Sequence, residues 1–362
     1  MSTATTPPLH LVTVPGDGVG PEVTAAALAV LRAALSSAGI RMEVSEHPIG
    51  GLALDQSGDP LPEPTLAACR RADAVLLGAV GGPRWDRRKP RPEAGLLRLR
   101  SGLGAFANVR PVRVMAGAEM HSPLRPEIVR GTDIVFVREL TGGAYFGKPR
   151  GVEGRPPDRR GVDTIEYSES EIRRVAEVAF TLARSRRHKL TSVDKANVLA
   201  TSVLWREVLD ELAEAHPDIE LEHALVDSFS LRVLLDPRRF DVVVTENLMG
   251  DILTDEAAAL VGTLGTLPSA SGGGDGPWLY EPVHGSAPDI AGKGLANPLG
   301  AIASTAMLLR LSLGREDLAK AVEQAIGAVV QAGSLTPDMN GALSTQAVTE
   351  AVLAQLGELV PA

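Results

Sequence analysis

The sequence is poor in cysteine and in aromatic residues. Cys69 is the only cysteine among 362 residues, so no intrachain disulfide can form. It ends the apolar run 66–69, and we interpret it as a core residue on the buried face of a helix rather than a nucleophile. Aromatic residues make up 3% of the chain, so aliphatic side chains must fill the core.

Targeting, membrane-spanning and nucleic-acid-binding features are also missing. Residues 1–8 lack the basic and apolar regions of a signal peptide, and no apolar stretch reaches the roughly 18 residues of a membrane span. The formal net charge of −9 leaves no basic face for nucleic acid or anionic lipid. We interpret the basic run 87–91 as a solvated loop. These absences favour a cytoplasmic protein without nucleic-acid or membrane partners.

What the sequence does contain is a regular alternation of strand and helix patterns. Apolar residues make up 44% of a chain whose length allows two domains. Short apolar runs predict strands at 9–14, 74–77, 134–137 and 242–244. Apolar stripes predict helices from about residue 22, at 171–184, and near 299–312, 315–331 and 344–358. The order indicates an α/β fold with a mostly parallel sheet, and residues 271–277 are expected to form a glycine-rich loop.

A glycine-rich turn follows the first predicted strand. Residues 16–22 read Gly-Asp-Gly-Val-Gly-Pro-Glu, which resembles the dinucleotide-binding fingerprint of Rossmann folds. The third glycine of that fingerprint would fall on Pro21, so the match fails. We interpret the segment as a strand-to-helix turn that needs no phosphate.

Three aspartates are candidate metal ligands. Asp251 and Asp255 are four residues apart, hence on one face at the start of a helix, where two carboxylates can hold a hard divalent cation. Acids at a helix start can instead complement the helix dipole. Asp227 follows another apolar run, and it is a possible third ligand or a helix cap.

Three arginines lie in nearly apolar surroundings: Arg100, Arg110 and Arg138. Each must find an anion, either a structural carboxylate such as Glu139 or a carboxylate of the substrate. Their number favours a ligand with more than one carboxylate.

Other candidates stand at strand ends and in a loop. Tyr145 lies in a glycine-rich turn and Lys195 directly follows a predicted strand, but spacing alone does not separate a proton carrier from a structural residue. Between residues 281 and 294, small residues surround His284 and Asp289. Such a loop lets backbone approach a ligand closely, and Asp289 could accept a hydrogen bond from a ribose hydroxyl.

Eight segments occur together in the order found in one family. The chain resembles the β-decarboxylating dehydrogenases of the isocitrate/isopropylmalate dehydrogenase family from about residue 9 to 350. The segments are 16–22, 81–85, 91–97, 106–111, 137–143, 193–199, 250–256 and 284–294.

The resemblance implies a fold of two α/β domains around an active-site cleft, which is not a Rossmann fold. Residues 1–105 plus 262–362 would form the first, cofactor-side domain. Residues 106–261 would form the second, with the metal, substrate and dimerisation elements. It also implies a homodimer in which Lys195 and Asp227 reach into the partner's active site.

The resemblance further assigns roles to the candidate residues. Substrate contacts would be Arg100, Arg110, Arg138, Asp227, Leu96 for the alkyl group, and Glu93 near the nicotinamide. Tyr145 and Lys195 would form the acid–base pair, with the lysine lowering the tyrosine pKa. The Mg²⁺ or Mn²⁺ ligands would be Asp227, Asp251 and Asp255. The NAD contacts would be His284, Gly285, Ser286, Ala287, Asp289, Ile290 and Asn297.

The implied activity is the NAD-dependent and metal-dependent oxidative decarboxylation of a 2-hydroxy acid. The nearest members convert 3-isopropylmalate to 4-methyl-2-oxopentanoate and CO₂ in leucine biosynthesis. The apolar pair Leu96 and Leu97 suits an isopropyl group, although isocitrate, homoisocitrate, tartrate and D-malate are alternatives. Asp289 followed by Ile290 favours NAD over NADP.

Two other classes are weaker. A non-catalytic subunit of the same fold would not need the acid–base and metal residues that the chain retains. An unrelated nucleotide-binding module is not supported by the failed glycine fingerprint. Three positions depart from the family pattern, namely Leu231, Arg232 and Met249.

Overall fold

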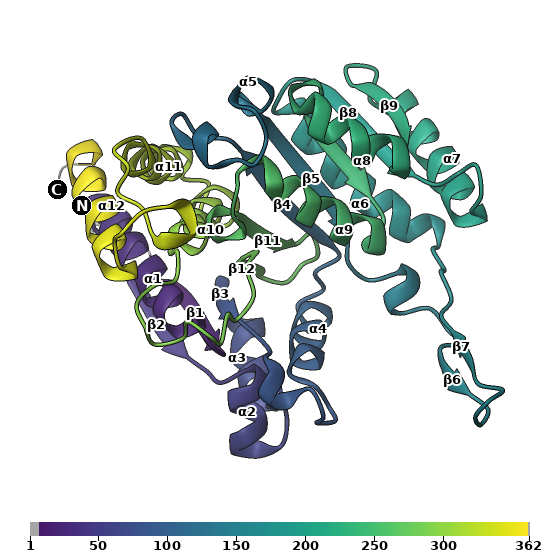
Figure 1. Ribbon diagram of the computed structural model, residues 1–362, viewed down its shortest axis with the longest axis horizontal. Helices are drawn as coiled ribbons and strands as arrows, with labels where there is room; N and C mark the ends of the chain where they lie inside the picture. Colours follow the sequence, from purple (N-terminus) through teal and green to yellow (C-terminus); the bar gives the residue numbers. More distant parts are fainter. Residues whose placement is uncertain (1–6, 361–362) are drawn as a thin grey trace, which may run out of the picture. The chain divides into compact units, whose positions relative to one another are not determined.

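The computed structural model describes residues 7–360, and the chain divides into two compact units (Figure 1). Unit 1 comprises Met1–Ala105, Met115–Ser122 and Val261–Ala362, and unit 2 comprises Phe106–Val114 and Pro123–Leu260. The expected boundaries assigned residues 115–122 and Val261 to the second domain, whereas the structure includes them in unit 1. Residues 1–6, part of the segment expected to lack a signal peptide, lie outside the described residues.

Unit 1 contains a sheet with the strand order β2-β1-β3-β12-β11. Its pairs are parallel except β11 with β12. The strands are β1 (Leu9–Gly16), β2 (Met42–Glu46), β3 (Ala74–Ala79), β11 (Pro268–Gly272) and β12 (Trp278–Pro282). The helices are α1 (Gly20–Ser37), α2 (Gly50–Ser57), α3 (Glu63–Arg71), α4 (Pro92–Gly102), α10 (Leu299–Leu311), α11 (Glu316–Gln331) and α12 (Thr345–Leu359).

Unit 2 contains a sheet with the strand order β4-β5-β10-β8-β9, which is parallel except for β4 with β5. The strands are β4 (Ala107–Arg113), β5 (Asp133–Glu139), β8 (Lys189–Asp194), β9 (Glu220–Leu225) and β10 (Val242–Thr245), and a separate hairpin is formed by β6 (Gly151–Glu153) and β7 (Arg160–Val162). The helices are α5 (Pro126–Val129), α6 (Glu169–Arg184), α7 (Ala200–Ala215), α8 (Val226–Leu235) and α9 (Asn247–Ala257).

The predicted elements are present, and burial explains why the pattern revealed them. All six residues of β3 are buried, as a strand covered on both faces requires. Helix α6 begins at a capping box formed by Ser168 and Glu171. Its apolar stripe, including Ile172 and Val175, packs into the core of unit 2. The expected α/β fold with a mostly parallel sheet is confirmed.

Two smaller predictions have clear outcomes. Cys69 is buried in the core of unit 1, and burial raises the pKa of its thiol to about 12, which confirms a packing role. Within residues 7–360, none of the helices combines the length and apolar character needed to cross a bilayer.

The glycine-rich segment near residue 275 has a packing explanation. Its first two residues belong to β11, so the loop is shorter than the expected 271–277. A Cβ on Gly274 would lie 2.6 Å from the carbonyl oxygen of Gly104, and one on Gly276 would lie 2.2 Å from that of Leu103. Glycine is therefore required because this loop packs against the backbone that follows α4.

Candidate active site

The turn after β1 uses its acidic residue inside unit 1. The Asp17 carboxylate accepts hydrogen bonds from the backbone N–H groups of Gly51 at 2.8 Å, Leu52 at 2.9 Å and Gly81 at 2.8 Å. It thus satisfies N-terminal amides of α2 and an amide of the loop after β3. The structural interpretation of the glycine-rich turn agrees with these contacts.

The same turn supports the loop expected to contact the cofactor. The Val19 N–H donates to the Ser286 carbonyl at 2.8 Å. A Cβ on Gly18 would lie 1.9 Å from that carbonyl oxygen, so the two backbones can approach only because residue 18 is glycine. Ala287, the next residue of the loop, has a φ of 37°, a left-handed conformation that non-glycine residues seldom adopt.

His284 offers an unused acceptor in this loop. Its Nδ1 donates to the Gly285 carbonyl at 2.9 Å, and its buried Nε2 has no hydrogen-bond partner. Burial lowers the pKa of the ring, which favours the neutral form with a lone pair on Nε2. Of the other expected cofactor contacts, Asp289 is exposed and Ile290 is half-buried.

Asn297 is buried, and its amide is already engaged. Its Nδ2 donates to Asp338 at 3.0 Å, and its Oδ1 accepts from the Leu299 N–H at 3.0 Å. The amide is therefore fixed in one orientation at the start of α10.

Helix α4 carries three of the expected substrate residues, which lie in different environments. Arg100 donates from Nη2 to Oε1 of Glu281 at 2.7 Å, and its buried Nε has no partner. Glu93 is exposed, although its carboxylate lies beside Gly81. Leu96 packs partly against the core of unit 1. The reasoning from sequence missed Glu281 as a partner of Arg100, and its one signal was an acidic residue within the short strand β12.

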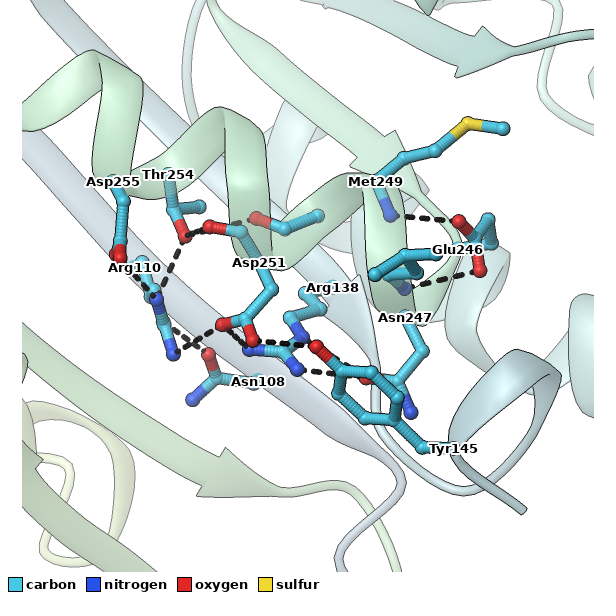
Figure 2. Close-up of polar contacts among 12 residues, drawn as sticks. Asn108, Arg110, Arg138, Tyr145, Glu246, Asn247, Met249, Asp251, Thr254 and Asp255 are labelled. Atoms are coloured by element: carbon cyan, nitrogen blue, oxygen red, sulfur yellow. Dashed lines mark hydrogen bonds and ion pairs between the residues drawn. The ribbon is translucent and has the colours of Figure 1, made fainter. Parts of the chain in front are cut away.

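In unit 2, two arginines and two aspartates come together (Figure 2). Arg138 on β5, with 4% of its side chain exposed, forms a short ion pair with Asp251 on α9. Arg110 on β4 lies 3.8 Å from Asp251 and 3.8 Å from Asp255. The sequence candidates Arg110, Arg138, Asp251 and Asp255 therefore form one charged cluster.

Neutral side chains orient the two arginines, and sequence reasoning missed them. Asn247 Oδ1 accepts from Arg138 Nη2 at 2.8 Å and from Nε at 3.1 Å. Arg110 donates to Asn108 at 2.6 Å and to Thr254 at 2.7 Å. The only signal for these partners in the sequence was that polar residues stand next to the charged motifs.

The position of Asp251 corrects one expectation. Helix α9 begins at Asn247, and the Glu246 side chain caps it, so Asp251 lies a full turn inside rather than at the helix start. Its side chain is 37% exposed and pairs with a nearly buried arginine, whereas that of Asp255 is 64% exposed. Removing the Asp251 charge would break its ion pair with the buried Arg138, so the dipole explanation understates the role of Asp251.

Tyr145 faces the same carboxylate. It belongs to the 3₁₀ turn Gly143–Tyr145, and its Oη donates to Asp251 Oδ2 at 2.8 Å. Burial raises the tyrosine pKa, and the hydrogen bond to Asp251 raises it further. The expected lowering of this pKa by Lys195 does not occur within the single chain, because the charges acting on Tyr145 are those of Asp251, Arg138 and Glu246.

Lys195 and Asp227 form a separate pair. Lys195 Nζ donates to Asp227 Oδ1 at 2.5 Å, and this bond lowers the pKa of the exposed carboxyl. Across residues 7–360, no group of three or more His, Cys, Asp or Glu side chains is placed to hold a metal ion. The expected metal ligands are thus divided within one chain: Asp251 and Asp255 lie on one helix, and Asp227 lies apart.

The donor chemistry of α9 nevertheless suits a hard divalent cation. Asp251 and Asp255 present carboxylate oxygens one helical turn apart. Burial raises the pKa of Asp255, and the neighbouring Asp251 charge adds to this effect. A divalent cation would offset the mutual repulsion of the two carboxylates.

Comparisons with known proteins give one answer. The family model for isocitrate/isopropylmalate dehydrogenase matches residues 10–352. A 3-isopropylmalate dehydrogenase from Anaeromyxobacter dehalogenans is 54% identical over 348 residues, covering 96% of this chain and 99% of the relative. One from Listeria monocytogenes is 50% identical, with coverage of 96% and 98%.

Solved structures agree. Isocitrate dehydrogenase from Methylococcus capsulatus has a TM-score of 0.86 and 34% identity, covering 96% of this chain and 99% of that one. A β-decarboxylating dehydrogenase from Thermococcus kodakarensis has a TM-score of 0.80 and 36% identity, covering 96% of each chain. The charged cluster on α9 and these full-length matches lead to the same conclusion: the chain belongs to the isocitrate/isopropylmalate dehydrogenase family.

Proposed function

We propose that the protein catalyses the NAD-dependent oxidative decarboxylation of 3-isopropylmalate to 4-methyl-2-oxopentanoate and CO₂ in leucine biosynthesis. The observation that carries this proposal is the cluster in which Arg110 and Arg138 meet Asp251, Asp255 and Tyr145 (Figure 2). It combines donors for carboxylates, oxygen ligands for a cation and a proton carrier. The names of the relatives select the substrate.

The residues of unit 2 would perform the chemistry. Arg110 and Arg138 would bind substrate carboxylates through their planar forks. Asp251 and Asp255, with Asp227 of a second subunit, would hold Mg²⁺ or Mn²⁺, which when bound supplies Lewis acidity at the oxidised carbon. NAD would supply the acceptor for the hydride from C2, after which the C3–carboxylate bond would break to release CO₂.

Two side chains would handle the protons. Lys195 from the partner would take the proton of the C2 hydroxyl, and Tyr145 Oη would deliver a proton to C3 after CO₂ leaves. The raised pKa of Tyr145 keeps the phenol protonated, as a donor requires. One proton is removed and one is added, so the protons balance. The two electrons that C2 loses as hydride are those that reduce NAD.

Unit 1 would supply the cofactor and alkyl contacts. NAD would contact the neutral His284 ring, its neighbours Gly285, Ser286 and Ala287, and also Asp289, Ile290 and Asn297. Glu93 would lie near the nicotinamide, with Arg100 and Leu96 toward the substrate. The exposed Asp289 carboxylate would repel the 2′-phosphate of NADP.

A homodimer would explain why the expected metal ligands are divided within one chain. Leu231 and Leu235 on α8 and Ile252 on α9 are each 61% exposed, and the two helices are linked by a hydrogen bond from Ser230 to Glu256 at 2.8 Å. A second copy packed on this apolar face would cover it. Because Asp227 stands in the first turn of α8, that packing would bring it toward the partner's site.

The substrate assignment is tested with a panel of 2-hydroxy acids. Contact of the isopropyl group with apolar side chains such as Leu96 should contribute about 2 kcal/mol, or some tens-fold in kcat/KM over unsubstituted malate. The assay uses purified protein, NAD and Mn²⁺. A higher kcat/KM for isocitrate or D-malate than for 3-isopropylmalate would refute the assignment.

The shared site is tested by subunit mixing. Lys195→Ala and Asp255→Asn subunits are combined after reversible dissociation. In a hybrid dimer one site would be intact and the other would carry both lesions, so each hybrid should regain about one working site. Verified hybrids no more active than either parent would show that each chain builds its own site.

A further inference from the structure

Two buried polar residues of unit 2, Glu246 and Tyr167, contact each other behind the charged cluster. Each is 7% exposed, and Tyr167 Oη donates to Glu246 Oε2 at 3.2 Å. We propose that this pair is a positioning device that sets the catalytic tyrosine, Tyr145, relative to the metal ligands Asp251 and Asp255. The proposal rests on the function proposed above. Glu246 and Tyr167 would not touch the substrate but would act through Tyr145 and the two aspartates.

The first contact of the pair is with the start of α9. Glu246 Oε1 accepts from the Met249 N–H at 2.7 Å, and Oε2 accepts from the Leu248 N–H at 3.1 Å (Figure 2). Tyr167 Oη accepts from the Asn247 N–H at 3.0 Å. Three amides of the first turn are therefore held, which fixes the helix that carries both aspartates.

The second contact is with the turn that carries Tyr145. A Cβ on Gly142 would lie 2.5 Å from the Tyr167 ring, and one on Gly143 would lie 2.4 Å from its Oη and 3.1 Å from Glu246 Oε2. The backbone of the turn thus lies directly on the pair. The Asn247 side chain adds a hydrogen bond from Nδ2 to the Gly142 carbonyl at 3.1 Å.

The third neighbour of the pair, across a small cavity, is the segment that carries Lys195. Glu246 and Tyr167 line a small cavity of about 10 Å³ together with Asp194 and Ser202. Ser202 Oγ accepts from the Lys195 N–H at 3.1 Å. One buried pair therefore borders the segments of three proposed functional groups.

A purely structural pair would contribute stability alone, whereas a positioning pair also changes metal affinity and turnover. Placement matters because an error of about 1 Å in a catalytic group can cost on the order of 100-fold in rate. Tyr167→Phe is the sharpest test, because it keeps the ring against Gly142 and removes only the hydroxyl. Tyr280→Phe is the matched control, since Tyr280 is buried in unit 1 and its hydroxyl bonds to Ser312 at 2.7 Å.

We expect Tyr167→Phe to weaken Mn²⁺ binding about 3- to 10-fold, measured by electron paramagnetic resonance without substrate or NAD. It should also lower kcat about 10-fold or more, with a smaller change in KM. Tyr280→Phe should lose comparable thermal stability while Mn²⁺ affinity and kcat stay at wild-type values. Glu246→Gln provides a second variant that keeps one oxygen acceptor for the helix cap.

The results separate this proposal from the proposed function. If Tyr167→Phe and Glu246→Gln lower only the melting temperature and leave Mn²⁺ affinity and kcat unchanged, the pair is structural and the proposal is wrong. If Tyr167→Phe does not fold, the Mn²⁺ affinity of Glu246→Gln decides in the same way. If the wild-type protein binds Mn²⁺ but oxidises none of the 2-hydroxy acids, the proposed function fails, and the effect of both variants on Mn²⁺ affinity still tests the positioning.

Discussion

Replacing Asp17 by asparagine should destabilise unit 1, because its carboxylate satisfies three backbone donors at once. Oδ2 accepts from Gly51 and Gly81, and Oδ1 accepts from Leu52. The asparagine oxygen can keep the first two bonds, but its NH₂ group then faces the Leu52 N–H, so one partly buried donor loses its acceptor.

The size of the effect follows from that count. A buried unsatisfied donor costs about 1–3 kcal/mol. For a chain of 362 residues, that corresponds to a decrease in Tm of roughly 1–4 °C. Asp17→Ala removes all three acceptor contacts, and we expect on the order of 4 kcal/mol.

Thr13→Val is the matched control for a buried polar change in the adjoining strand. Thr13 is fully buried on β1 and its hydroxyl has no partner, so removing it should be neutral or stabilising. Both variants are compared with wild type by calorimetry. If Asp17→Asn melts within about 1 °C of wild type, or if Thr13→Val is the more destabilised, the accounting of hydrogen bonds is wrong.

Three further predictions follow from single contacts. Because burial raises its pKa to about 12, the Cys69 thiol should react with a thiol reagent at pH 8 only after unfolding, and rapid labelling of the native protein would contradict this. Asp255→Asn should weaken Mn²⁺ binding with little change in Tm, whereas Asp251→Asn should lower both Mn²⁺ affinity and Tm because it removes the ion pair with the buried Arg138; equal Tm values would contradict the difference. Ser168→Ala should lower the unfolding free energy by about 1 kcal/mol in urea titrations, and an unchanged midpoint would exclude a stabilising cap.

Three of the strands predicted from the sequence have uninterrupted apolar runs. β3, β5 and β10 are buried along their length, so their composition alone identifies them. β9 is mostly partly exposed, and β4 contains two arginines and a proline, so neither shows an apolar run or a clear alternation. The buried Arg110 of β4 donates to Asn108 on its own strand and to Thr254, which lies 144 residues further along the chain and is brought close only by the fold.

The candidate site was predictable in its residue types but not in its contacts. The family motifs identified Arg138 and Asp251, while nothing local indicated that Asn247 would hold the arginine or that Tyr145 would bond to the aspartate. Asp17 is the reverse case: a conspicuous motif residue that contacts only backbone amides of its own unit through its carboxylate. Hydrogen bonds between distant segments depend on which segments the fold brings together, and a sequence motif alone does not specify this.

Sheet register is the step that connects the core of unit 2 to its charged cluster. Arg138 at the end of β5 pairs with Asn108 of β4 on one side and with Thr245 of β10 on the other. The chain leaves β10 at Thr245, so α9 must begin beside Arg138. A slip of one residue would turn Arg138 to the opposite face and would also place each buried apolar residue of β5 against the packing partners of the wrong face. The same apolar residues that predict β5 therefore fix the position of the arginine that meets Asp251.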